Sequence, residues 1–282
     1  MPTFEAPDGA LLSYRSDGHG EPLLCLPGGP MRASAYLGDL GGLSARRRLI
    51  LLDLRGTGDS QPPDDDSGYR CDRQVADVEA LRVHLGLERM DVLAHSAAGD
   101  LGLLYALAHP DRVRSLVLVT ARLRPLGIEF TDGHLQEAAA LRSGEPWFEA
   151  AMRGYANLAN GSTADEDWGA VMPFFYGRWD EQARAHAAAG SEQSNEHAAG
   201  LFSPPDAFDP EAGRAVVASW GVPVLLLAGE LDGGPRPHVV VEAARLFDDA
   251  RTVTQPGGGH FPWLDDPVFF SDAVATFLDR RR

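Results

Sequence analysis

The segment Met90-Asp-Val-Leu-Ala-His-Ser-Ala-Ala-Gly-Asp-Leu-Gly-Leu-Leu104 joins two kinds of local structure. Its apolar run up to His95 predicts a buried strand, and helix-compatible residues continue from Ala97 to the stop at Pro110. Ser96 falls in the sharp turn between them, where its hydroxyl points outward and the helix directs its positive N-terminal end toward it. The segment therefore predicts a strand–turn–helix unit that presents a serine.

The residues around Ser96 leave two interpretations open. They form a looser version of Gly-x-Ser-x-Gly, with Ala94 and Ala98 at the glycine positions. Such a serine can be an exposed nucleophile, or it can simply cap the helix that follows. A nucleophile needs a base, a carboxylate that orients the base, and N–H donors for a developing oxyanion. The choice depends on whether the remaining sequence supplies these groups in the right order.

A base is predicted near the C-terminus, in Gln255-Pro-Gly-Gly-Gly-His-Phe-Pro-Trp263. Three successive glycines allow a loop that carries His260 over the ends of the strands without Cβ clashes. His260 is therefore the predicted base. The other eight histidines are expected to be surface or core residues without a catalytic role: His19, His84, His95, His109, His134, His186, His197 and His238.

The orienting carboxylate is expected between the nucleophile and the base. The stretch Val224-Leu-Leu-Leu-Ala-Gly-Glu-Leu-Asp-Gly-Gly-Pro235 predicts a strand followed by a turn that holds Glu230 and Asp232. Asp232, three residues past Gly229, has the usual turn placement and is the predicted partner of the base, with Glu230 as the alternative. The chain order is then serine, aspartate, histidine.

Oxyanion donors are expected in a turn after an early strand. Leu23-Leu-Cys-Leu-Pro-Gly-Gly-Pro30 has that form, and its glycines let backbone N–H groups approach an anion closely. The predicted donors are the N–H groups of Gly29 and Ala97.

The alternation of apolar runs and amphipathic stretches predicts a parallel sheet covered by helices, an α/β fold. A helix is expected at 72–85, capped by Asp72, and others near 239–247 and from Asp266-Pro267 onward. Residues 122–214 offer helical segments but no obvious strand. The sequence thus divides into a first core part (1–121), a helical cap (122–214) and a second core part (215–282). Strands are predicted at 11–14, 22–26, 49–53, 91–95, 115–120, 223–228 and 252–254.

The ordered motifs together resemble the α/β-hydrolase fold superfamily. The Gly28-Gly29-Pro30 turn and the Asp53-Leu-Arg-Gly-Thr-Gly-Asp-Ser60 stretch resemble its proline iminopeptidase-like branch more narrowly. The resemblance implies a mostly parallel central sheet flanked by helices, with an inserted helical cap. It also implies a Ser96–His260–Asp232 triad.

The sequence departs from that branch at three positions. Pro27 stands where the branch usually has histidine, Leu54 where it often has glutamine, and Asp59 where arginine is common. In such peptidases the insertion contributes carboxylates that grip the free amine of a substrate, and most of the carboxylates here are expected on a solvated face. The insertion carries Glu145, Glu149, Asp165, Glu166, Asp167, Asp180, Glu181, Glu192 and Glu196.

Aromatic residues of the insertion are candidates for the lining of a substrate pocket, although simple docking of helices on the core accounts for them equally well. The stretch Pro173-Phe-Phe-Tyr-Gly-Arg-Trp-Asp-Glu181 places aromatic residues beside charges. The candidates are Trp147, Phe148, Phe174, Phe175, Tyr176 and Trp179.

Composition excludes several classes of partner. The 282 residues carry a formal net charge of −16, which disfavours nucleic acid and anionic membranes. No apolar stretch approaches the ~20 residues needed to span a bilayer, and the N-terminus lacks the layout of a signal peptide. Cys25 and Cys71 suggest neither a disulfide framework nor a metal site, so a cytoplasmic protein without metal or cofactor is expected.

The leading hypothesis is a cofactor-independent serine hydrolase that cleaves an ester or amide of a small molecule or short peptide. A proline iminopeptidase-like aminopeptidase and a small-molecule esterase or lactonase are both open, as is carbon–carbon bond hydrolysis with the same triad. A ligand-binding receptor with vestigial turnover is an alternative of another class, because fold does not fix function. The sequence does not determine the oligomeric state.

Overall fold

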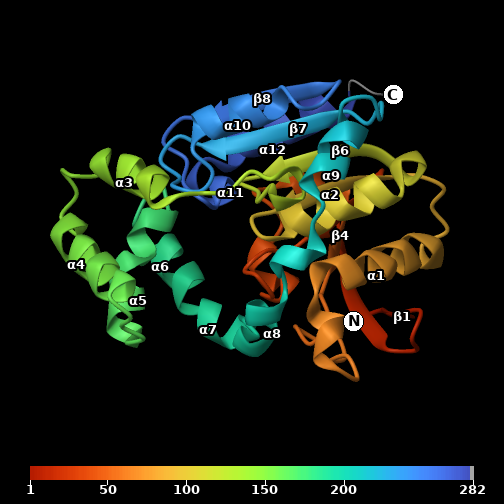
Figure 1. Cartoon of the computed structure of the whole chain (residues 1–282), viewed down its shortest axis with the longest axis horizontal. Helices are drawn as coiled ribbons and strands as arrows, with labels where there is room; N and C mark the ends of the chain where they lie inside the picture. The colour runs from red at the N-terminus through yellow and green to blue at the C-terminus, as the bar shows by residue number, and fades with distance from the viewer. Residues whose placement is uncertain (280–282) are drawn as a thin grey trace.

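The computed structural model describes residues 1–279 and centres on one eight-stranded sheet (Figure 1). The strand order is β1-β2-β4-β3-β5-β6-β7-β8. β2 is antiparallel to both of its neighbours, and every neighbouring pair from β4 to β8 is parallel, so the carboxyl ends of these strands share one edge. The strands are β1 Thr3–Glu5, β2 Leu11–Asp17, β3 Pro22–Leu26, β4 Arg48–Leu52, β5 Met90–His95, β6 Val113–Val119, β7 Val224–Gly229 and β8 Ala250–Gln255.

Both faces of the parallel strands are apolar, which explains their continuous hydrophobic runs. Successive side chains alternate between two cores: Leu226 belongs to one, and Leu225 and Leu227 belong to the other. Helices α1 (Cys71–His84) and α2 (Ala98–Ala108) contribute to the first core. Helix α12 (Pro267–Asp279) and the short α11 (Pro262–Asp265) contribute to the second. The predicted α/β architecture is confirmed.

Several local predictions need correction. Helix α1 begins at Cys71, and Asp72 does not cap it: its carboxylate lies in the first turn and pairs with Arg70. Helix α10 spans Pro237–Ala244, which is earlier than expected because Pro237 suits the first helical turn. The short strand β1 was not predicted, since three residues carry almost no periodic signal.

The segment between β6 and β7 is helical (Figure 1, green to teal). Most of its helices lie on one side of the molecule, beyond the edge of the sheet, whereas α9 lies near α2. We call this segment the cap. Its helices are α3 Asp132–Ala140, α4 Phe148–Ala159, α5 Asp165–Val171, α6 Glu181–Ala188, α7 Gly190–Gln193, α8 Glu196–Leu201 and α9 Pro210–Val217.

The Asp53–Ser60 motif forms a buried turn after β4. One Asp53 oxygen accepts a hydrogen bond from the Ser34 N–H at 2.8 Å, and the same carboxylate occupies the space that a Cβ on Gly58 would need. The Ser60 hydroxyl donates to the Asp53 carbonyl at 2.6 Å and accepts from the Ser13 N–H at 2.8 Å. The motif therefore joins β2, β4 and the segment after β3.

Among the described residues, no helix combines the length and apolar character needed to cross a bilayer.

Asp100 on α2 is a fully buried carboxyl between core and cap. Its oxygens accept hydrogen bonds from the Ser203 hydroxyl at 3.0 Å and from the Arg124 N–H at 3.1 Å. Burial nevertheless raises its pKa to about 6, because the low-dielectric surroundings penalise the charged form more than these bonds favour it.

Replacing Asp100 by asparagine removes this titration while keeping an oxygen for the Arg124 N–H. The wild-type carboxyl stabilises the fold fully below its ordinary pKa of 3.8 and loses that contribution as the pH rises through about 6. We expect the unfolding free energy of Asp100→Asn, relative to wild type, to increase by roughly 2 kcal/mol between pH 4 and 7. Urea titrations across this range measure it. The exposed Asp111→Asn controls for charge, and a difference independent of pH would contradict the prediction.

Candidate active site

Ser96 occupies a strained turn at the carboxyl end of β5. Its φ of 55° is in the left-handed region, which a residue with a side chain adopts only when its surroundings hold it there. Its N–H donates to the Val119 carbonyl at 3.0 Å, and its carbonyl accepts from Gly99 at 2.9 Å and Arg122 at 2.8 Å. These bonds place the hydroxyl at the N-terminal end of α2, as the sequence predicts.

The structure brings His260 to Ser96. His260 Nε2 lies 2.8 Å from Ser96 Oγ, and the backbone of His260 is held on both sides. Its N–H donates to the Phe175 carbonyl of the cap at 2.7 Å. Its carbonyl accepts from His95 Nε2 and from the Thr120 hydroxyl, both at 2.9 Å. The imidazole is therefore positioned by groups from the cap and from the core.

Asp232, rather than Glu230, lies against the imidazole. Its Oδ2 is 2.8 Å from His260 Nδ1, and its Oδ1 accepts from the Gly234 N–H at 3.0 Å. The carboxylate is buried, whereas Glu230 is exposed and accepts from the Gly257 N–H. A hydroxyl, an imidazole and a buried carboxylate in line can pass a proton from the alcohol to the ring.

Of the two predicted oxyanion donors, Ala97 follows Ser96 directly, and Gly29 follows Gly28, whose backbone lies against Ser96. A Cβ on Gly28 would be 2.8 Å from Ser96 Cβ and 3.3 Å from the Ala97 nitrogen, so only glycine lets this loop approach so closely. Among the described residues, no acceptor is bonded to the N–H of Gly29 or of Ala97, whereas the Gly28 N–H donates to the Tyr36 hydroxyl at 2.6 Å. The two predicted N–H groups are therefore available to an oxygen on a substrate.

The glycine run before His260 packs directly on the cap. A Cβ on Gly259 would lie 2.6 Å from the Gly177 nitrogen and 2.7 Å from the Phe175 carbonyl oxygen. Asp265 clamps the two segments: one oxygen accepts from the Gly259 N–H at 2.8 Å, and the other from Gly177 at 2.9 Å and Arg178 at 3.2 Å. Burial raises the pKa of Asp265, and these three N–H bonds oppose that shift.

The aromatic residues of the cap take different positions. The Phe175 ring lies 5.8 Å from that of His260, at the site. Tyr176 is buried and its ring stacks on that of Phe261 at 5.0 Å, so it packs between the cap and the core. The other candidates contact neighbouring aromatic rings, Trp147 and Phe148 on Phe174, and Trp179 on Tyr176.

The carboxylates of the cap lie at its surface or are engaged. Asp167 accepts from Asn157 and Ser162, and Asp180 accepts from the Ala183 N–H at the start of α6. Within the described residues, the cap therefore contributes no pair of buried carboxylates that could grip an amine. Of the nine carboxylates named in the sequence analysis, the exposed ones are Glu145, Glu149, Asp165, Glu166, Glu181, Glu192 and Glu196.

Sequence reasoning missed Tyr36, His95 and His186, which connect the parts of the site. His95 Nδ1 lies 2.7 Å from the Tyr36 hydroxyl, and both residues are buried. His186 lies between the Tyr36 carbonyl at 3.1 Å and the Tyr176 hydroxyl at 2.8 Å, and burial lowers its pKa to about 4. The position of His95 directly before Ser96 was the one available signal.

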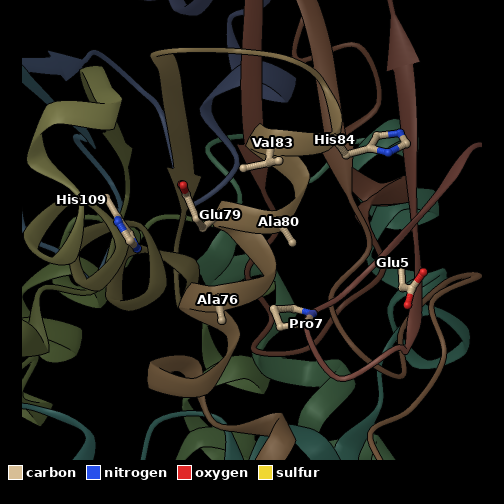
Figure 2. Close-up of a pocket in the computed structure, with 8 residues that line it drawn as sticks. All are labelled: Glu5, Pro7, Ala76, Glu79, Ala80, Val83, His84 and His109. Carbon is tan, nitrogen blue, oxygen red and sulfur yellow. The ribbon is translucent and has the colours of Figure 1, made fainter.

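A surface groove of about 530 Å³ lies elsewhere, between the end of β1 and helix α1 (Figure 2). Its Glu79 is engaged by Arg82 and Tyr105, and its His84 lies 3.4 Å from the Tyr14 hydroxyl. Among the described residues, no three His, Cys, Asp or Glu side chains are placed so that they could hold a metal ion together, so the groove is not a candidate metal site. It is lined by Glu5, Pro7, Ala76, Glu79, Ala80, Val83, His84 and His109.

Comparison with known proteins agrees with this architecture. Residues 21–267 match the model of the alpha/beta hydrolase fold family. A 139-residue segment is 40% identical to a "Probable proline iminopeptidase" of Streptomyces coelicolor, covering 44% of this chain and 43% of that protein. The chain thus matches less than half the length of this relative.

Two further proteins match over most of their length, one in sequence and one in structure. An sn-1-specific diacylglycerol lipase of Mus musculus is 28% identical over 236 residues, covering 82% of this chain and 72% of the lipase. The crystal structure of an esterase from Rhodococcus sp. ECU1013 has a TM-score of 0.74 at 24% identity, covering 100% of this chain and 99% of the esterase. The structural likeness shows a shared fold.

Substituting Gly259 by alanine tests the contact between the glycine run and the cap. A Cβ there meets backbone atoms that cannot move independently, so we expect a loss of about 1–3 kcal/mol of unfolding free energy, together with reduced activity. Gly144→Ala is the matched control, because nothing lies within 4 Å of its Cβ position. Chemical unfolding of both variants measures the difference. Equal stability of the two variants would show that the contact is not tight.

Proposed function

The chain belongs to the α/β-hydrolase fold family, and we propose that it is a hydrolase that cleaves small-molecule esters through Ser96, His260 and Asp232. The observation that carries the proposal is the pair of 2.8 Å contacts that join hydroxyl, imidazole and carboxylate. His260 is the general base, and Asp232 holds the imidazole with its Nδ1 proton directed at the carboxylate.

In the first half of the reaction, Ser96 Oγ attacks the ester carbonyl as its proton passes to His260 Nε2. The carbonyl oxygen becomes an oxyanion that accepts hydrogen bonds from the N–H groups of Gly29 and Ala97. The N-terminus of α2 adds a favourable field. The tetrahedral intermediate then collapses: the bond to the leaving alkoxide breaks, and that oxygen takes the proton from His260.

In the second half, water replaces the alcohol. His260 removes a proton from water as the water oxygen attacks the acyl carbon, and the same N–H groups stabilise the second oxyanion. Collapse breaks the bond between Ser96 Oγ and the acyl carbon, and the proton returns to Ser96. The carboxylic acid leaves, and neither metal nor cofactor takes part in these steps.

The cap favours an ester over an amine-bearing peptide. Gripping a free α-amine needs buried carboxylates, and those of the cap lie at the surface or are engaged by other groups. The side chain from the cap that lies against His260 is instead the aromatic Phe175. An apolar acyl or alcohol group suits such a neighbour.

A proline iminopeptidase-like aminopeptidase is the second candidate. The observation that favours it is the 40% identity to the Streptomyces coelicolor protein over 139 residues. The same triad would cleave an amide bond, with His260 protonating the leaving amine.

A fluorophosphonate probe tests the nucleophile. We expect it to label the folded wild type at Ser96, located by peptide mass spectrometry, and to leave Ser96→Ala unlabelled. The same substitution should lower kcat by roughly a thousandfold or more, because no other group supplies the attacking oxygen. The exposed Ser143→Ala is the control and should label as wild type does. Full activity in Ser96→Ala would overturn the proposed mechanism.

Two substrate series separate the candidates. We expect turnover of short-chain p-nitrophenyl esters by wild type and its loss in Ser96→Ala, with proline arylamides cleaved far more slowly. Steady-state kinetics on both series provide the measurement. A higher kcat/KM on proline arylamides would favour the aminopeptidase, and a single stoichiometric burst without turnover would favour a binding protein.

A further inference from the structure

A buried chain of hydrogen bonds joins the two loops that flank Ser96. The Gly28 N–H donates to the Tyr36 hydroxyl at 2.6 Å, and that hydroxyl lies 2.7 Å from His95 Nδ1. His95 Nε2 lies 2.9 Å from the His260 carbonyl oxygen. This hydrogen-bond chain thus runs from the Gly28–Gly29 loop, which we call the oxyanion loop, to the loop that carries His260.

The chemistry of its ends determines the direction of every bond. A carbonyl oxygen accepts only, so His95 Nε2 carries the imidazole proton that is donated to His260. His95 Nδ1 is then an acceptor, and the Tyr36 hydroxyl donates to it. The Tyr36 oxygen is left to accept from the Gly28 N–H. Each member therefore has one partner on each side, and none can be removed without leaving a buried group unpaired.

Burial among aromatic residues protects this hydrogen-bond chain from water. Tyr36 is 4% exposed and His95 is 1% exposed, with Phe261 and Trp263 packed against both rings. Burial, and next the electrostatic effect of the neighbouring His260, lowers the pKa of His95 well below its ordinary value, so the His95 imidazole stays neutral. Burial also raises the pKa of Tyr36, which keeps its proton available for donation.

We propose that Tyr36 and His95 are positioning residues, which hold the Gly28–Gly29 loop and the His260 loop at the spacing that acyl transfer at Ser96 requires. Neither side chain contacts the reacting atoms: Tyr36 acts through the backbone of Gly28, and His95 acts through the backbone of His260. This inference rests on the proposed function of Ser96. It gives a role to His95, which directly precedes the nucleophile but is buried away from solvent.

The cap is connected to this hydrogen-bond chain at Tyr36. His186 Nε2 donates to the Tyr36 carbonyl at 3.1 Å, and His186 Nδ1 accepts from the Tyr176 hydroxyl at 2.8 Å. Docking of the cap is therefore coupled to the residue that holds the oxyanion loop.

Tyr36→Phe tests the inference, since it removes one hydroxyl and keeps the ring. The substitution leaves the Gly28 N–H and His95 Nδ1 unpaired. The neighbouring Gly29 N–H then loses its alignment with the oxyanion. We expect kcat on a p-nitrophenyl ester to fall about ten- to a hundredfold, with KM within about twofold, because displaced oxyanion donors weaken the transition state and not the ground state. A boronic acid, which forms a tetrahedral adduct with Ser96, should lose affinity by a similar factor.

Tyr105→Phe is the matched control. Its hydroxyl is also buried and donates to a side chain, Glu79 Oε2 at 2.9 Å, but Tyr105 lies in the last turn of α2, at the end away from Ser96. We expect the two variants to lose similar stability in thermal unfolding, whereas only Tyr36→Phe loses kcat and boronate affinity. Equal kcat in the two variants, or a parallel loss of kcat in both, would overturn the positioning role. Fluorophosphonate labelling of Ser96 in Tyr36→Phe at a reduced rate supports it.

The two proposals fail in distinguishable ways. If the proposed function is wrong, wild type itself does not label at Ser96, and Ser96→Ala keeps its activity. If only the positioning role is wrong, wild type labels at Ser96 and turns over esters, and the kcat of Tyr36→Phe equals that of Tyr105→Phe.

Discussion

The site depends above all on how the backbone of His260 is held. Its carbonyl accepts hydrogen bonds from His95 and Thr120 of the core, and its N–H donates to Phe175 of the cap. Misplacing a catalytic group by about 1 Å can cost about a hundredfold in rate, so under the proposed mechanism these backbone bonds contribute to activity. Core and cap must both be folded before the imidazole can meet Ser96.

Close approach between backbones is the second requirement, and glycine meets it. Gly28 lies against Ser96, and Gly259 lies against Gly177 of the cap, at distances that leave no room for a Cβ. Such contacts bring loops from distant parts of the chain within reach of one hydroxyl. Asp265 secures the second of them by accepting three N–H groups. The carboxyl edge of the parallel sheet thereby becomes a single preorganised site.

The cap supplies packing and a boundary to the site more than charge. Its carboxylates face solvent or cap helices, while Tyr176 and His186 tie it to the core through aromatic contacts and hydrogen bonds.

The local sequence by itself determined four features: the strand–turn–helix around Ser96, the glycine-rich loop before His260, the α/β alternation and the helical character of 122–214. Each of these depends on consecutive residues, through their hydrophobic periodicity, their turn-forming residues or their small side chains. Only the tertiary structure placed the predicted Asp232 against His260, showed which cap carboxylates are engaged by other groups, and gave His95 a partner in Tyr36. These outcomes depend on which groups meet across distant segments and on which of them lose contact with water. Burial and hydrogen-bond pairing cannot be derived from the residue spacing within one segment, because both depend on how the sheet, the loops and the cap pack together.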